Sequence, residues 1–549
     1  MVKGVGKGAV AQRYFSRHRV IAGAEFIMSR TWRVPGSRRL KAITLAAVLA
    51  LTGMLPASMT QARQAHAVND TLTIGWPIAP QTFDPPSAPD NPSIWVLVNI
   101  YDQLLRTAND GVTLQPDLAT SWDISKDGTI YTFHLRHNVT FHNGAPLTAA
   151  DVKFSLDRAR QPSQVWAFIL GAIKKVDVVD TYTVKVTLLY PWAPFLSDVA
   201  FFGSAVYPEA YFKKVGAAYM AQHPVGTGPY MLEAYKNGSM TRLKKNPNYF
   251  LANQFPMQHV EFDVIPSDST RLLEVESGQL DVDNVLATNL VATINASQNA
   301  KAQILPSTKI TYLQPNHKVT PFGDVNVRQA INHAINRAAI IKAVYKGYAS
   351  PANSFMAKGA IDWDPNIPAP TFDLALARKY LAKSSAPHGF NMTLDLGTGN
   401  LEQQQISVIF QAEMKQIGIN VTIKQMDPTT LATANQSMKF DMINQYWTND
   451  IPDPDELVAY ALDYSNTSIR AYYTQYNNPT LVNLVHKGEA TRDPAARKAI
   501  YYQIQQIFAQ QVPFFYLTYD PLFNGVNNHV HNFSQNPLGY FALQGVTKS

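Results

Sequence analysis

Alternation of apolar and polar residues predicts several short strands. In Thr181–Leu188, Tyr182, Val184, Val186 and Leu188 point to one face, and the intervening Thr and Lys residues point to the other. Further strands are expected at Thr71–Trp76, Ile130–Arg136 and Val260–Ile265. Residues 77–92 are rich in proline, so we expect a loop after the first of these strands.

Helical periodicity is clearest in Val325–Tyr345, which we predict to be one helix. Its apolar stripe consists of Val327, Ala330, Ile331, Ala334, Ile335, Ala338 and Ile341. Thr148 and Asp151 form a capping box that opens another helix. Further helices are expected at Leu97–Leu105, Ser269–Gly278 and Arg497–Gln511.

The second half of the chain contains a β-α-β pattern. Met392–Leu396 is predicted to be a strand, Leu401–Ile417 a helix that Gly418 ends, and Ile419–Lys424 a strand. Phe440–Trp447 is predicted to be a further strand of the same sheet. A chain of 549 residues is too long for one core. We therefore predict an α/β protein with at least two lobes.

The segment Lys439–Leu457 combines a strand with an acidic loop. Pro452 and Pro454 end the strand, and the loop carries Asp450, Asp453, Asp455 and Glu456 beside the aromatic residues Tyr446 and Trp447. In open α/β sheets, ligands bind at the carboxyl ends of strands. Carboxylates next to aromatic rings suit a ligand with a cationic or polar group. A solvated acidic turn explains the same residues, and residue types alone do not decide between the two.

The net charge of +7 comes from the first 67 residues. They contain eleven of the 47 basic residues and one of the 40 acidic residues, so the remainder carries −3 and gives no indication of nucleic-acid binding. Within this leader, 30–41 is basic, Ala42–Leu55 is apolar, and Ala65–Ala67 is an A-x-A cleavage site. We predict a signal peptide cleaved near Ala67, with Met28 as the start. The chain has no cysteine, which excludes a lipid-anchored cysteine and disulfides.

Four motifs resemble those of the family 5 extracellular solute-binding proteins, the peptide, nickel and oligosaccharide receptors of ABC importers. The segment from Phe141 to Ser155, FHNGAPLTAADVKFS, resembles their FxxGxPLTAxDVxFS motif. Pro224–Tyr230 resembles their PVGTGPY turn, Ser277–Val282 their GexDi segment, and Asp324–Arg337 their VRxAixxAidR helix. The order and spacing of these motifs hold from about Thr71 to Phe541.

The resemblance implies a periplasmic receptor with two lobes and a ligand cleft between them, of the large periplasmic-binding-protein type. Residues 68–308 would form lobe I with an extra subdomain at about 111–223, 309–520 would form lobe II, and 521–549 would return to lobe I. The lobes would close over a peptide-like solute by a hinge motion and deliver it to an ABC permease. We expect a monomer that needs no cofactor.

The family also suggests binding residues. The segment Tyr446–Asp450 resembles the family's aromatic-x-x-Asp segment, whose Asp pairs with the α-ammonium group of a peptide in the peptide receptors. We therefore expect Asp450 to bind a cationic group, with Tyr446, Trp447 and Asn449 beside it. A buried carboxylate is costly unless it is paired, which favours a cationic ligand. Asp453 and Asp455 are expected to face water.

One departure leaves the ligand open. Dipeptide receptors have an arginine early in the helix that matches Leu401–Ile417, and it clamps the peptide carboxylate. Here the first turn contains Glu402, Gln404 and Gln405 but no arginine, so a carboxylate would lose its strongest partner. Gln404 and Gln405 are candidates for hydrogen bonds to a peptide backbone or to sugar hydroxyls, or they are surface residues. An oligosaccharide or opine receptor is therefore the alternative.

Other chemistry has little support in the sequence. His134, His137 and His142 lie close together, and His529 and His531 form an HxH pair, but their surroundings are polar and we expect solvated side chains rather than a metal site. The sequence contains no G-x-S-x-G or H-E-x-x-H motif and no cysteine. An exported hydrolase is thus a minor alternative, and we expect no enzyme. A periplasmic chaperone that retains the fold but binds unfolded chains is a third alternative.

Overall fold

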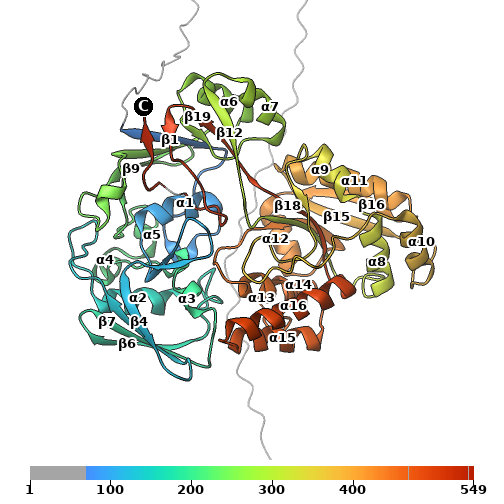
Figure 1. The fold of residues 1–549 in the computed structure, drawn as a ribbon, viewed down its shortest axis with the longest axis horizontal. Helices are drawn as coiled ribbons and strands as arrows, with labels where there is room; N and C mark the ends of the chain where they lie inside the picture. The colour runs from blue at the N-terminus through green and yellow to red at the C-terminus, as the bar shows by residue number, and fades with distance from the viewer. Residues whose placement is uncertain (1–69, 468, 542) are drawn as a thin grey trace, which may run out of the picture. The chain divides into compact units, whose positions relative to one another are not determined.

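A computed structural model describes residues 70–467, 469–541 and 543–549. The predicted signal peptide, its cleavage site and the start at Met28 lie outside these residues. Where the chain is described, no helix is long and apolar enough to span a bilayer. Two central sheets organise this part of the chain (Figure 1).

The first central sheet has seven strands in the order β12-β19-β11-β1-β10-β9-β8. β1 lies near its centre and pairs in parallel with both β10 and β11. The strands are β1 (Thr71–Trp76), β8 (Tyr230–Lys236), β9 (Met240–Lys245), β10 (His259–Val264), β11 (Val282–Asp283), β12 (Ala300–Leu305) and β19 (Leu522–Asn527). The helices in these parts of the chain are α1 (Asn91–Ile100), α4 (Glu209–Val215), α5 (Ala217–Met220), α6 (Asp268–Ser277) and α7 (Val291–Ala296).

A four-stranded antiparallel sheet in the order β4-β5-β7-β6 lies between β1 and β8 in the chain. It consists of β4 (Ala119–Ile124), β5 (Ile130–Leu135), β6 (Ile173–Asp180) and β7 (Thr183–Leu188). The neighbouring elements are β2 (Leu105–Thr107), β3 (Leu114–Pro116), α2 (Ala149–Ala159) and α3 (Phe195–Asp198). We call these two sheets and their helices lobe I, together with β20 (Val530–His531) and β21 (Thr547–Lys548).

The second central sheet has six strands in the order β14-β18-β13-β17-β15-β16. Its strands are β13 (Ile310–Pro315), β14 (Ser350–Pro351), β15 (Asn391–Gly397), β16 (Asn420–Met426), β17 (Met442–Trp447) and β18 (Phe515–Tyr519). Its helices are α8 (Val325–Ala334), α9 (Arg337–Ala343), α10 (Leu374–Ala382), α11 (Leu401–Lys415), α12 (Pro428–Gln436), α13 (Asp455–Leu462), α14 (Arg470–Tyr473), α15 (Pro479–Ala490) and α16 (Pro494–Gln511). We call this part lobe II.

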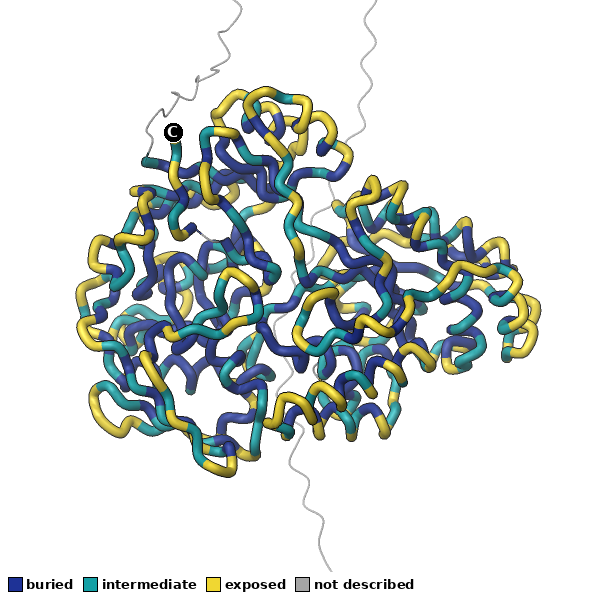
Figure 2. Tube along the Cα trace, in the orientation of Figure 1, coloured by how far each residue is buried: buried dark blue, intermediate teal, exposed yellow. Residues whose placement is uncertain are grey.

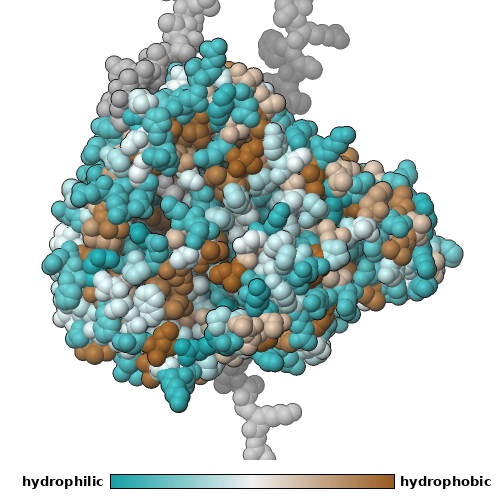
Figure 3. All heavy atoms as spheres, viewed as in Figure 1, coloured by the Kyte–Doolittle hydropathy of each residue, from teal (hydrophilic) through white to brown (hydrophobic). Residues whose placement is uncertain are grey.

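Lobe II has a core on each face of its sheet, because successive side chains of a strand point to opposite faces. Leu313 packs with the side chains of α8, α10 and α11 on one face. Ile310 and Tyr312 pack with those of α13, α15 and α16 on the other. The buried positions follow the strands, whereas exposed positions gather on the outer sides of the helices (Figure 2). Apolar side chains form only small separate patches on the face shown in Figure 3.

The chain passes between the two central sheets twice, from β12 to β13 and from β18 to β19. The two crossings are hydrogen-bonded to each other. The Asp520 N–H donates to the Lys309 carbonyl at 3.0 Å, and the Ser307 hydroxyl donates to the Asp520 carbonyl at 2.5 Å. The Thr311 hydroxyl donates to Asp520 Oδ2 at 2.6 Å.

Three element predictions are wrong. The expected helix Leu97–Leu105 begins earlier, because Asp90 accepts from the Ser93 N–H and caps α1. The expected helix Val325–Tyr345 is two helices, because the Asn336 side chain caps α9 by accepting from Ala339 N–H. The acidic loop after β17 is shorter than expected, since α13 already begins at Asp455.

Candidate functional site

The loop between β17 and α13 is held by one carboxylate from the first turn of α13. Glu456 Oε2 accepts hydrogen bonds from the backbone N–H of Asp450 at 2.8 Å and of Ile451 at 3.0 Å. Glu456 Oε1 accepts from the Trp447 indole N–H at 3.1 Å. These three bonds fix the direction in which the chain leaves the end of the strand, and so they position Asp450.

The same loop contacts lobe I. Ile451 is 1% exposed and belongs to the apolar core of lobe I, with Trp76 and Tyr101. The Tyr540 hydroxyl donates to the Asp450 carbonyl at 2.8 Å. The segment around Asp450 therefore lies where lobe II meets lobe I, which is where the sequence comparison with the family expects a ligand.

Asp450 and Glu456 form an acidic pair. Burial and the neighbouring Glu456 raise the pKa of Asp450 well above its usual value. Burial raises the pKa of Glu456 to about 7. Among the described residues no basic side chain forms an ion pair with Asp450. The two carboxyl groups thus favour holding a proton, and a cation beside Asp450 would favour its release.

Asn449 adds an acceptor next to this pair. Its side chain is 2% exposed, and its Oδ1 atom has no hydrogen-bond partner among the described residues. Its backbone N–H donates to the Thr308 hydroxyl at 3.0 Å, at the first crossing between the lobes. A buried amide oxygen without a donor is unfavourable, so this atom suits an N–H or O–H group of a ligand or a water.

The two predicted aromatic residues point to opposite faces of the sheet, since they are neighbours on one strand. Tyr446 is 41% exposed, and the Lys309 ammonium lies 5.2 Å from the centroid of its ring. Trp447 is half-buried and stacks on Tyr460 with 4.2 Å between ring centroids. Only Trp447 shares a hydrogen-bond partner with Asp450, through Glu456.

Arg470 lies beside the stacked rings of Trp447 and Tyr460. Its guanidinium carbon is 5.2 Å from the ring centroids of Trp447 and Tyr460 and 5.7 Å from that of Tyr312. Its Nη1 atom also donates to the Tyr312 hydroxyl. Burial lowers the pKa of Arg470 to about 10. These residues, with Tyr516, line a cavity of about 20 Å³.

The position where dipeptide receptors have an arginine is occupied differently here. Glu402, in the first turn of α11, lies 3.2 Å from the Lys309 ammonium, which also lies 3.6 Å from Asp520. Gln404 is half-buried and Gln405 is exposed, with no side-chain hydrogen bond to the loop around Asp450. Gln403 instead exchanges hydrogen bonds with Asn444 of β17. The structure therefore does not bring Gln404 and Gln405 together with the acidic pair.

Asp453 and Asp455 do not face water, contrary to the expectation. Both are buried, and Asp453 accepts two hydrogen bonds of 2.7 Å from Arg497 of α16. Burial and the carboxylates of Glu489 and Asp453 raise the pKa of Asp455 well above its usual value. The prolines and polar residues of the loop suggested solvent exposure, but α15 and α16 cover this side of it.

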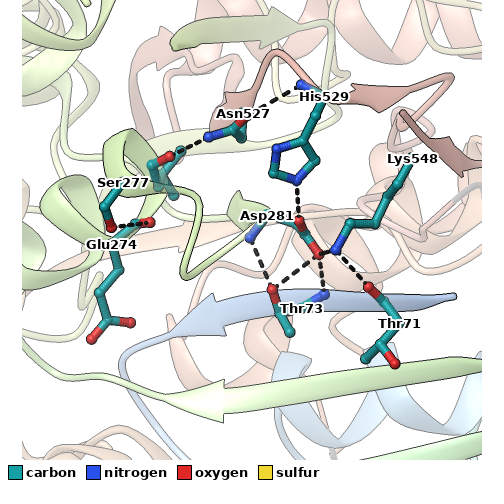
Figure 4. A network of polar contacts seen from close by, with 9 residues as sticks. Thr71, Thr73, Glu274, Ser277, Asp281, Asn527, His529 and Lys548 are labelled. Carbon is teal, nitrogen blue, oxygen red and sulfur yellow. Dashed lines mark hydrogen bonds and ion pairs between the residues drawn. The ribbon is translucent and has the colours of Figure 1, made fainter. Parts of the chain in front are cut away.

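Two of the histidines that were expected to be solvated contact other protein groups instead. His142 is half-buried, contacts the Gly228 carbonyl at 3.1 Å, and its pKa is lowered by burial to about 4. His529 Nε2 lies 2.5 Å from Asp281 Oδ1. Lys548 and Thr73 also donate to Asp281, so that this carboxylate joins β21 and the segment before β20 to β1 (Figure 4). The described residues contain no group of three or more side chains suited to hold a metal ion.

A larger cavity of about 280 Å³ lies within lobe II, between α8, α16 and the loop 367–371. Arg337 lines it but donates to the Tyr516 carbonyl at 2.8 Å and to Asn332 Oδ1 at 2.7 Å. Its hydrogen bonds are thus met within the protein, which fits a structural role.

Comparison with known proteins identifies the family. Residues 113–469 match the middle region of the bacterial extracellular solute-binding proteins, family 5. The chain belongs to this family. It is a binding protein rather than an enzyme.

The related proteins below align with most of this chain and with nearly all of their own length. A probable D,D-dipeptide-binding periplasmic protein of Escherichia coli (strain K12) is 27% identical over 86% of this chain and 93% of its own length. A Helicobacter pylori ABC transporter-associated periplasmic binding protein, solved with the peptide STSA, is 27% identical with a TM-score of 0.78, covering 87% of this chain and 98% of that one. An Agrobacterium periplasmic binding protein solved with agropinic acid is 26% identical, also with a TM-score of 0.78, covering 87% and 99%. These likenesses confirm the predicted α/β fold with two lobes.

Sequence reasoning missed two residues of this region. Glu456 was assigned to a loop, although its place four residues before Tyr460 on an apolar helix could have identified it as a first-turn carboxylate. Arg470 stands alone in the sequence between Ile469 and Ala471, and no local pattern relates it to Trp447.

Proposed function

We propose that this family 5 protein captures a peptide-like solute with a free amino group between its lobes and delivers it to an ABC permease. The observation that carries the proposal is the carboxyl group of Asp450, which has an acidic neighbour and no ion pair among the described residues. An ammonium group beside it would supply the missing opposite charge. The relatives that bind peptides support this ligand class.

In this proposal Asp450 binds the ammonium group of the ligand, and Asn449 Oδ1 accepts a hydrogen bond from one of the N–H groups of that ammonium. Trp447 forms an apolar wall. Tyr446, Gln404 and Gln405 would contact longer ligands from the other face of β17. Lobe I would consist of residues 68–308 and 521–549, and lobe II of residues 309–520. The two lobes would move relative to each other about the crossings at Lys309 and Asp520. Ligand contacts on both lobes would favour the closed form that the permease recognises. The receptor would act as a monomer, exported with cleavage near Ala67.

An opine or a related amino-acid conjugate is the second candidate. Glu402 occupies the region in which dipeptide receptors clamp a carboxylate, and a neighbouring structure contains agropinic acid. Asp450 keeps its role with an opine that carries an ammonium group, and loses it with one that carries only carboxylates.

A thermal-shift screen tests the proposal, because a ligand that binds only the folded protein raises the melting temperature as its concentration exceeds Kd. The purified protein would be screened against peptides of two to five residues, opines and oligosaccharides. We expect peptides to raise the melting temperature, and Asp450→Asn to remove most of that rise. A rise with oligosaccharides alone would contradict the peptide assignment, and an unchanged rise in Asp450→Asn would exclude Asp450 from the site.

A further inference from the structure

Arg470 is a charged group whose surroundings in the protein are incomplete. Three aromatic rings surround its guanidinium, from Tyr312, Trp447 and Tyr460. In the described part of the chain no acidic side chain forms an ion pair with it. Aromatic faces attract a cation but accept few of the five N–H donors that a guanidinium carries.

The other cation nearby is already paired. The Lys309 ammonium lies 3.2 Å from Glu402 and 3.6 Å from Asp520, so two carboxylates neutralise it. Arg470 differs because it donates a hydrogen bond to a neutral hydroxyl, that of Tyr312. Of these two cations, Arg470 is the one that retains the capacity to bind an anion.

Arg470 and the acidic pair adjoin the same indole ring. The Trp447 N–H donates to Glu456, which also holds the backbone of Asp450, while the Arg470 guanidinium lies 5.2 Å from the Trp447 ring centroid. A cavity of about 20 Å³ at Arg470 has room for a water-sized group. Trp447 and Arg470 line this cavity and Asp450 does not, so a small molecule that meets both charges extends past the Trp447 ring.

The geometry points to Arg470 as the residue that binds a carboxylate of the ligand, so that the solute is a zwitterion with its ammonium group at Asp450 and its carboxylate at Arg470. This inference rests on the proposed function, because it assumes that the ligand lies beside Asp450. It accounts for the absent arginine in the first turn of α11, because the carboxylate contact comes from the first residue of α14 instead. A guanidinium suits this role because it binds both carboxylate oxygens at once.

The test compares ligands that differ only in their carboxylate. The purified protein is incubated with a pool of peptides of two to five residues with free C-termini, and separately with a pool that has C-terminal amides and no Asp or Glu. Retained peptides are identified by mass spectrometry, and the acid and amide forms of one retained peptide are titrated by calorimetry. We expect the acid form to bind at least about 100-fold more tightly, since it alone can form the paired ion contact.

Variants assign that preference to a residue. Arg470→Met should bind acid and amide forms equally, Arg470→Lys should keep part of the preference, and Arg378→Met, on the exposed surface of α10, should keep all of it. Melting curves show whether each variant is folded. The comparison in the unaltered protein needs no variant, so poor folding of Arg470→Met does not remove the test.

The failures can be told apart. If peptides bind but acid and amide forms bind equally, the role of Arg470 is wrong and the proposed function stands. If Arg470→Met is folded and keeps the preference for the acid form, the carboxylate is bound elsewhere and the inference is again wrong. If neither pool binds, the proposed function is wrong, and the inference with it.

Discussion

Replacing Glu489 by Gln should stabilise the protein at alkaline pH and much less at acidic pH. Glu489 lies near the C-terminus of α15 and is 8% exposed. Its backbone carbonyl accepts a hydrogen bond from the Ala193 N–H of lobe I at 2.7 Å. Burial and the neighbouring Asp463 raise its pKa from 4.5 to about 8. The folded protein thus holds a proton on Glu489 that the unfolded chain releases at lower pH.

The sign follows from this difference. An acid whose pKa is higher in the folded than in the unfolded state makes the folded protein less stable as pH rises, here between about pH 4.5 and pH 8. Each pKa unit corresponds to about 1.4 kcal/mol, so a shift from 4.5 to about 8 gives an upper limit of about 5 kcal/mol. Gln cannot ionise, so Glu489→Gln escapes this loss. Part of the raised pKa comes from repulsion by Asp463. We therefore expect the free energy of unfolding of Glu489→Gln to exceed that of the unaltered protein by about 2–4 kcal/mol at pH 9.

Thermal unfolding measures the effect. With an unfolding entropy of about 2 cal/mol/K per residue, a lobe of about 200 residues shifts by about 2 °C for each kcal/mol. Glu489→Gln should therefore melt about 4–8 °C higher than the unaltered protein at pH 9 and only about 2 °C higher at pH 5. Glu276→Gln, on α6 of lobe I, is the control that removes one carboxylate from another part of the protein. Equal melting temperatures of Glu489→Gln and the unaltered protein at pH 9 would refute the argument.

Three further predictions concern other parts of the structure. Asp453→Asn breaks the buried pair with Arg497 and should cost about 3–5 kcal/mol, seen as a lower melting temperature; an unchanged value would contradict the role of this pair. Gly389→Ala should destabilise the protein far more than Gly399→Ala, although both glycines have positive φ. An added Cβ would lie 1.9 Å from the Gly418 carbonyl oxygen at Gly389 and would meet nothing within 4 Å at Gly399. Equal melting temperatures of the two variants would show that the backbone adjusts. Binding of a peptide amine should release a proton, because the ammonium lowers the raised pKa of Asp450, so that affinity rises with pH until the amine itself deprotonates near about pH 8. Calorimetry in buffers of different ionisation enthalpy measures this proton, and proton uptake instead of release would exclude the mechanism.

Local patterns predicted the elements that depend on local features. β7 begins within two residues of its predicted start, because alternation along one strand determines which side chains are buried. α11 ends two residues before the predicted end, with Gly418 at positive φ just beyond it. Local periodicity failed where a cap interrupts an apolar stripe. Asn336 separates α8 from α9, although apolar residues continue in register across the break.

The site was predictable only in part. The aromatic-x-x-Asp segment identified the loop that contains Asp450, and this loop contacts the core of lobe I through Ile451. The partners of that loop depend on tertiary structure. Arg497 pairs with Asp453 from 44 residues away, and Arg470 meets Tyr312 across 158 residues, so neither contact leaves a pattern in the local sequence.

The exposure of the acidic residues was misjudged for the same reason. A loop with two prolines and three aspartates is typical of a solvated turn. Here Arg497 supplies a positive charge, and burial raises the pKa of several neighbouring carboxyl groups, which can then remain neutral. The sequence alone does not show that a basic residue from a distant helix covers the loop.

One calorimetric comparison shows whether Asp450 binds the ammonium group of the solute. A peptide retained by the protein is titrated against its N-acetylated twin, which has no ammonium group, with the unaltered protein and with Asp450→Asn. We expect acetylation to weaken binding to the unaltered protein by at least about 100-fold, because it removes the ion pair with Asp450. It should make little difference in Asp450→Asn, which has no such pair to lose. Equal affinity of the unaltered protein for both peptides would contradict the account.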